Sequence, residues 1–236
     1  MIVQLPMLDD RKSGYGFLSP VSSHGKWRAW HCGNDLNFGK TAWADFDAEV
    51  KPMADGKVVY SRNAGPGWGN LVVIYHHELT RLFGHPVYSR YAHFNKVLVS
   101  AEQEVTKSSV IGFCGKTGTS SPHVHWEVLK RKLDHWTLYP NGWSEEKVLK
   151  YWFNPYKFME EANQKANEVS EFAEESVEKA IGKMIATQWT NPKQIVGDAV
   201  VEQVFINLGV LKQREGNLTK ERLIVALDRL HVFDKL

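Results

Sequence analysis

The chain has 236 residues, of which 43% are hydrophobic and 24% are charged, a composition typical of a globular protein with one large or two small domains. Lys and Arg total 29 against 27 for Asp and Glu, and the resulting net charge of +2 gives no indication of nucleic-acid binding. No apolar run is long enough to predict a transmembrane segment.

The amino-terminal residues 1–10 lack the basic start of a secretory signal peptide. We therefore expect no signal peptide and synthesis in the cytoplasm. The two cysteines, Cys32 and Cys114, could form a disulfide, bind a metal or be ordinary buried thiols. A reducing compartment favours buried thiols.

A short segment around residue 33 is the first candidate for metal binding. His31 and Asp35 are an even number of residues apart, so both side chains point to one face of an extended strand. A helix would also align them, but Gly33 is a poor helix former and the flanking residues are apolar and aromatic. Gly33 lies between the two on the same face, where we expect it to leave room for an ion.

Two further segments carry histidines. His93 ends an apolar, strand-like run, in which an unpaired imidazole would be costly to bury. His123 and His125 alternate along the next candidate strand, so both imidazoles point the same way. Glu127 follows on that face and is expected either to accept the free N–H of a metal-bound imidazole or to be a solvent-facing carboxylate.

His31, Asp35 and His125 together supply two imidazoles and one carboxylate, the donor set of a catalytic zinc site with an open fourth position. A lone His-x-His pair is weak evidence, because the chain has 10 His and isolated pairs are more often core or surface residues. The additional histidine segments favour the zinc site, with these three residues as ligands.

From about residue 159 the pattern changes to apolar residues at three- and four-residue steps against a Glu- and Lys-rich face. Pro192 and Thr219 supply start signals for a second and a third helix. The pattern predicts a small helical domain over 159–236. Such a bundle could pack on the preceding domain or pair two chains into a homo-oligomer.

Several motifs between residues 13 and 158 occur in the order of a known family. They are Ser13-Gly14-Tyr15-Gly16, His31-x-Gly33-x-Asp35, Pro52-Met53-Ala54-Asp55-Gly56, Gly69-Asn70-Leu71-Val72, Tyr91-Ala92-His93, Gly115-Lys116-Thr117-Gly118-Thr119 and His123-Val124-His125-Trp126-Glu127. With them the chain resembles the lysostaphin-type (LytM domain) zinc metallopeptidases, which cut peptide cross-links in bacterial cell walls. It departs from the family pattern at Phe17 and Leu18, where an arginine is common, and in a longer stretch over 76–89.

The resemblance implies an α+β chain: a mostly antiparallel β catalytic domain with the family's duplicated hybrid motif over 1–158, then the helical domain over 159–236. It implies one zinc ion per chain on His31, Asp35 and His125. It also gives His93 and His123 catalytic roles beside the metal.

The implied function is zinc-dependent hydrolysis of peptide cross-links in bacterial peptidoglycan. Without a signal peptide, we expect a phage-encoded endolysin or virion-associated hydrolase that reaches the wall after lysis or release, with the helical domain as a candidate wall-binding module. The alternative is a wall-binding or phage tail assembly component in which cleavage is incidental. A phosphotransfer carrier would also use paired histidines, but Asp35 in the ligand set argues against it.

Overall fold

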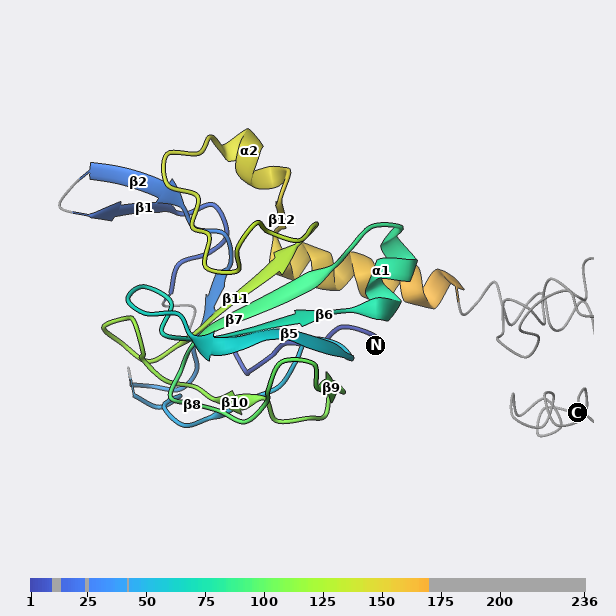
Figure 1. Cartoon of the computed structure of the whole chain (residues 1–236), viewed down its shortest axis with the longest axis horizontal. Helices are drawn as coiled ribbons and strands as arrows, with labels where there is room; N and C mark the ends of the chain where they lie inside the picture. Colours follow the sequence, from blue (N-terminus) through green and yellow to red (C-terminus); the bar gives the residue numbers. More distant parts are fainter. Residues whose placement is uncertain (10–13, 24–25, 42, 170–236) are drawn as a thin grey trace, which may run out of the picture. The chain divides into compact units, whose positions relative to one another are not determined.

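The computed structural model describes residues 1–9, 14–23, 26–41 and 43–169 (Figure 1). The chain divides into two compact units, residues 1–166 and 167–236. The helical domain expected over 159–236 therefore falls largely outside the described residues, and the fold below is that of the first unit. Within the described part of the chain, no helix has the length and apolar character needed to cross a membrane.

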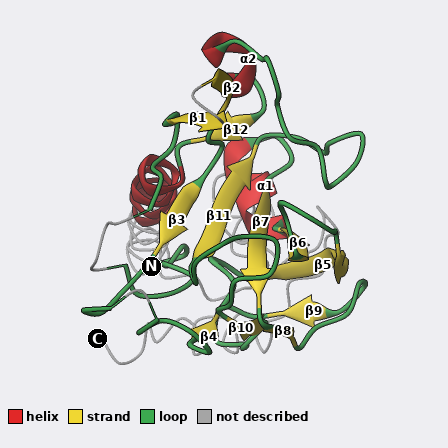
Figure 2. Ribbon diagram, turned by 90° about the vertical axis from the view of Figure 1, so that its left-hand side faces the viewer, coloured by secondary structure: helices red, strands yellow, loops and turns green. Residues whose placement is uncertain are grey.

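The described part of the first unit is built on an antiparallel sheet (Figures 1 and 2). Its strands are β3 (Asn34–Leu36), β5 (Gly56–Asn63), β6 (Asn70–Tyr75), β7 (Tyr88–Phe94), β9 (Glu104–Val105), β11 (Val124–Leu129) and β12 (Trp152–Phe153). They follow the order β12-β11-β7-β6-β5-β9, and β3 also pairs with β11. The expectation of a mostly antiparallel β domain is confirmed, whereas the duplicated motif remains a prediction.

Two smaller sheets flank this one. A hairpin joins β1 (Pro20–Ser23) to β2 (Lys26–Trp30), and a three-stranded sheet has β10 (Gly112–Phe113) between β4 (Glu49–Val50) and β8 (Lys96–Val97). All their pairings are antiparallel. In Figure 2 the three-stranded sheet lies below the central strands in the view.

Strand β11 is buried along its whole length. Val124, Trp126 and Val128 belong to the main hydrophobic core, as the alternation of a strand requires. His125 and Glu127 lie at the intervening positions and are 5% and 0% exposed. The strand thus buries apolar residues on one face and carries polar, chemically active residues on the other.

The long stretch over 76–89 contains helix α1 (His77–Phe83), which buries Leu79 in the main core. The helix ends at Gly84, whose φ of 70° is left-handed and whose N–H donates to the carbonyl of Thr80. The extra residues over 76–89, which depart from the family pattern, therefore form a helix that packs against the core.

Helix α2 (Glu145–Leu149) precedes β12, and residues 155–166 at the end of the unit are also helical. Phe158 and Ala162 of this segment pack in the main core. The Asn163 side-chain oxygen accepts hydrogen bonds from the N–H groups of Ile2 and Val3. The domain boundary expected between residues 158 and 159 falls inside this helical segment.

Candidate metal centre and groove

Pairing of β3 with β11 brings the first and last histidine motifs together. Asp35 lies opposite His125 in the register of these two strands. His31 precedes β3 by a short bend instead of continuing a single strand as expected, and it still reaches the same point. On the other edge of β11, Ala92 of β7 pairs with His125, which places His93 at the same end of the sheet.

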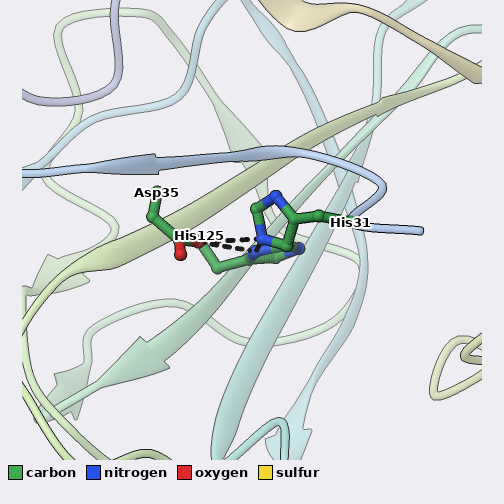
Figure 3. A group of neighbouring side chains, drawn as sticks. All are labelled: His31, Asp35 and His125. Carbon is green, nitrogen blue, oxygen red and sulfur yellow. Dashed lines mark hydrogen bonds and ion pairs between the residues drawn. The ribbon is translucent and has the colours of Figure 1, made fainter. Parts of the chain in front are cut away.

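His31, Asp35 and His125 form a tight triangle of potential ligand atoms (Figure 3). His31 Nε2 lies 2.8 Å from His125 Nδ1 and 3.1 Å from Asp35 Oδ1, and His125 Nδ1 lies 3.0 Å from the same carboxylate oxygen. Among the described residues, these three form the one group of His, Cys, Asp or Glu side chains whose ligand atoms lie close enough together to hold a metal ion.

The donor set passes a test of fit for a zinc ion. With bonds of about 2.0–2.1 Å, tetrahedral ligand atoms lie about 3.4 Å apart, so the triangle need widen only by a few tenths of an ångström. His31 Nδ1–H donates to the carbonyl of Gly16 at 3.1 Å, and His125 Nε2–H donates to Glu127 at 2.8 Å. Each imidazole therefore keeps its other nitrogen for the centre of the triangle.

Asp35 is held as a carboxylate. Burial would raise the pKa of its carboxyl group, but His125 and His31 outweigh burial when their inner nitrogens carry a proton, and they hold that pKa well below the ordinary value. The backbone N–H of Tyr15 donates to the second carboxylate oxygen at 3.2 Å. The Asp35 side chain is therefore a negatively charged carboxylate near pH 7. A carboxylate in this form can bind a cation directly.

His93 lies where the backbone departs from regular strand geometry. The register between β6 and β7 shifts by one residue near it, and its φ is +71°, uncommon for a residue other than glycine. Bulges of this kind often re-aim a side chain beside an active site. The His93 ring lies 4.6 Å from the His123 ring and 6.0 Å from the His125 ring, measured between centroids.

His93 and His123 present equivalent nitrogens. Their Nδ1–H groups donate to the carbonyls of Thr117 and Ser121, at 2.9 and 3.0 Å. Burial, aided by the neighbouring histidines, lowers the pKa of His93 to about 3; burial also lowers the pKa of His123, although Asp35 opposes it. Both imidazoles are therefore neutral near pH 7 with an unprotonated Nε2, and His123 Nε2 lies 3.6 Å from Asp35 Oδ1.

Gly33 has a different role from the one expected. A Cβ at this position would lie 2.2 Å from the carbonyl oxygen of Trp126 and 2.8 Å from Cγ of Glu127. The missing side chain therefore makes room for β11, not for an ion. The expectation that Gly33 opens space at the metal was wrong, although its place between the two ligands was informative.

The metal centre opens into a groove of about 1010 Å³. Besides the three candidate ligands and the imidazoles of His93 and His123, its lining includes Tyr15, Trp68, Tyr139, Arg28 and Asn141. The Trp68 ring lies 5.6 Å from His125 and 6.0 Å from Tyr139, between centroids. An open channel beside a buried donor set is suited to an extended chain such as a peptide.

The sequence reasoning missed Arg90, which is fully buried and contacts Glu127 directly. The only available signal was an arginine inside the apolar run Tyr88–Phe94, where an unpaired charge would be costly. Tyr139 was also missed, because it lies in a connection without motif character. Cys32 and Cys114 are buried free thiols, as predicted.

An antiparallel β fold with an open His/Asp/His donor set and two further imidazoles beside it is an arrangement typical of metal-dependent hydrolases. The model of peptidase family M23 matches residues 36–137, which include His93, His123 and His125. Lipoprotein NlpD of Yersinia enterocolitica is 39% identical over 75 residues, 32% of this chain and 70% of that protein. The chain belongs to peptidase family M23, which confirms the family predicted from the motifs.

Other relatives differ in their named roles. Murein hydrolase activator NlpD of Salmonella dublin is 43% identical over 79 residues, which are 34% of this chain and 19% of the relative. Peptidoglycan DD-endopeptidase ShyA of Vibrio cholerae is 41% identical over 83 residues, 35% of this chain and 17% of ShyA. The match thus spans about a fifth of the length of these two relatives.

Proposed function

We propose that this chain is a zinc-dependent endopeptidase that hydrolyses peptide cross-links of bacterial peptidoglycan. The observation that carries the proposal is the complete donor set, His31, Asp35 and His125, with two neutral imidazoles beside it in an open groove. The relatives support the substrate class, since they are named for murein hydrolase activation and for peptidoglycan cleavage.

His31 Nε2, His125 Nδ1 and Asp35 would hold the ion. Zinc bound there supplies Lewis acidity, which polarises an amide carbonyl and makes water available as a nucleophile near neutral pH. Because Glu127 accepts the distal N–H of His125, it keeps that ring in the tautomer that leaves Nδ1 for the metal. Of the two roles left open for Glu127, this one is part of the proposal, since the side chain is fully buried.

His93 and His123 would carry the proton steps. Each has its Nδ1–H bound to a backbone carbonyl, so each has Nε2 free to accept a proton from attacking water. Once protonated, the same nitrogen can donate to the developing oxyanion or to the leaving amine. The fixed backbone bonds hold the two rings in place and lower the cost of ordering them during the reaction.

A second candidate function is the activation of another wall hydrolase, which the name of the Salmonella dublin relative favours. An activator needs a binding groove but not a metal, so the donor set favours catalysis. The same argument applies to the wall-binding or phage assembly alternative, which also needs a binding surface but no metal. The phage-encoded setting and release after lysis stay part of our proposal, and the gene's neighbours would test them.

The test is digestion of purified peptidoglycan by the zinc-loaded protein alone, by the protein with a chelator, and by the protein with a separate purified wall amidase. We expect soluble fragments with new peptide amino termini from the first sample and none with chelator. If fragments appear only with the amidase, and chelator or His93→Ala does not diminish them, the activator function replaces ours.

A further inference from the structure

A fully buried polar cluster next to the candidate metal ligands joins Arg90 to Glu127. Arg90 Nε donates to Glu127 Oε2 at 2.7 Å and Nη2 donates to Oε1 at 2.8 Å, a paired geometry of two nearly parallel bonds. Both side chains are 0% exposed. Taking two charges out of water is expensive, and the cost is recovered only where the remaining donors and acceptors are also satisfied.

These remaining groups are satisfied in two directions. Toward the metal, Glu127 accepts the Nε2–H of His125 at 2.8 Å, and Oε2 also accepts from Trp152 Nε1 at 2.7 Å. Away from the metal, Arg90 Nη1 donates to the carbonyls of Trp136 and Leu138, at 2.7 and 3.1 Å. A single guanidinium therefore contacts both the support of a metal ligand and a backbone segment 46 to 48 residues later in the chain.

That backbone segment leads directly into the groove wall. Residue Tyr139 follows Leu138 and lines the groove. Trp68, another lining residue, has the Arg90 guanidinium 4.1 Å from its ring centroid and donates from Nε1 to the carbonyl of Thr137 at 2.9 Å. Arg90 thus contacts Trp68 directly and holds the backbone segment that leads to Tyr139.

We propose that Arg90 is a positioning residue that couples the metal centre to the substrate groove. It fixes Glu127, which orients the His125 ring, and it anchors residues 136–138, which place Tyr139 and Trp68 against the peptide. The groove role rests on the proposed function, whereas the effect on metal binding does not. If the Arg90–Glu127 ion pair had only a structural role, its loss would lower the stability of the fold but would leave zinc affinity and KM of the folded protein unchanged.

The geometry explains why lysine is a poor substitute. Arg90 uses donors on all three guanidinium nitrogens in a fixed plane, whereas an ammonium group offers one nitrogen and cannot reach the carboxylate and both carbonyls together. Arg90→Lys retains the charge opposite Glu127 but loses the planar contacts. Glu127→Gln retains the shape of the acid and the bonds from Arg90 to residues 136–138, while weakening the acceptor for His125.

The experiment measures zinc affinity by competition with a chromophoric chelator, and KM and kcat on a cross-linked muropeptide, for folded Arg90→Lys and Glu127→Gln. We expect about 10- to 100-fold weaker zinc binding in both variants. In Arg90→Lys alone, we expect a several-fold higher KM measured at saturating zinc. The control is Arg81→Lys, which alters an exposed Arg81–Glu78 pair with two 3.0 Å bonds on α1.

Wild-type zinc affinity and KM in a folded Arg90→Lys protein would overturn the proposal. A double variant Arg90→Lys/Glu127→Gln in which the two losses of zinc-binding free energy simply add would also overturn it. Two residues that act on His125 through one chain of contacts are not independent, so their effects should not add. If Arg90→Lys fails to fold, Trp68→Phe, which loses the bond to Thr137, tests the groove side: unchanged KM there contradicts the coupling. If no variant cleaves any substrate, including wild type, the proposed function fails while the zinc measurements still test Arg90.

Discussion

His31 Nε2 and His125 Nδ1 lie 2.8 Å apart, although 94 residues separate them in the chain. The pairing of β3 with β11 creates this proximity, because Asp35 then lies opposite His125. Two imidazole nitrogens that close are stable only if they share a proton or a cation, and each has its other nitrogen bonded to a separate acceptor. This arrangement predicts that the candidate ligands and the neighbouring histidines respond differently to substitution.

Alanine at His31 or His125 should remove bound zinc and cleavage together, because two ligands cannot hold the ion firmly. Alanine at His93 or His123 should leave close to one zinc per chain and lower kcat by about 100-fold or more, since these residues act in proton transfer. Metal analysis after dialysis, followed by peptide cleavage, checks both. His77→Ala on the exposed start of α1 is the control, and equal zinc loss in all four site variants would refute the assignment.

Gly33→Ala should destabilise the protein severely. Its Cβ would lie 2.2 Å from the Trp126 carbonyl oxygen, so β3 and β11 would have to separate. We expect a loss of about 3 kcal/mol or more in the free energy of unfolding, with loss of zinc binding. Gly16→Ala, whose Cβ meets its nearest atoms only at 3.8 Å, is the matched control. Denaturant titration of the two variants compares them, and a Gly33→Ala protein as stable as Gly16→Ala would contradict the model of close packing.

His76 predicts a pH dependence of stability unrelated to the metal. It is 0% exposed, its nitrogens bond to the Asp55 carbonyl and the Ser89 hydroxyl, and burial lowers its pKa to about 4. The unfolded value is about 6.5, so its contribution is fully present above pH 6.5 and is lost as pH falls toward 4. The difference corresponds to about 3 kcal/mol.

The measurement is the free energy of unfolding at pH 7.5 and pH 4.5 for wild type and His76→Gln. The variant should show a smaller drop between these two pH values, because its side chain does not titrate. His77→Gln, one residue further along the chain and exposed, should follow wild type. Identical pH dependence in wild type and His76→Gln would show that His76 is not the group responsible.

Arg28 predicts a preference for anionic substrates. It is exposed and, among the described residues, it is the single Lys or Arg in the groove lining and forms no ion pair with an Asp or Glu. Arg28→Gln should raise KM about two- to fivefold for a stem peptide with a free carboxylate, and leave KM unchanged for its amidated form. Arg62→Gln on exposed β5 serves as control. An equal KM change for both peptides would remove Arg28 from substrate recognition.

Sequence reasoning could propose residues for the centre because strand periodicity is local. The alternation of His123, His125 and Glu127 with buried Val124 and Trp126 depends only on neighbours in the chain, and the structure shows that alternation. The three candidate ligands, His93 and His123 all line the same groove. Their catalytic roles are still proposals.

What the sequence could not predict depends on contacts between distant segments. The space beside Gly33 is filled by Trp126 and Glu127, which are more than ninety residues away, so its role could not be inferred locally. The left-handed φ of His93 arises at a register shift between two strands. Arg90 acquires its role only because residues 136–138 return to its guanidinium.

The most direct test of the central claim is zinc titration of chelator-stripped protein, with new peptide amino termini from purified peptidoglycan counted by mass spectrometry at each step. We predict that cleavage rises linearly and saturates at one zinc per chain, and that His125→Ala gives none at any zinc level. Cleavage that persists without zinc, or saturating zinc binding with intact peptidoglycan of every type, would contradict the account.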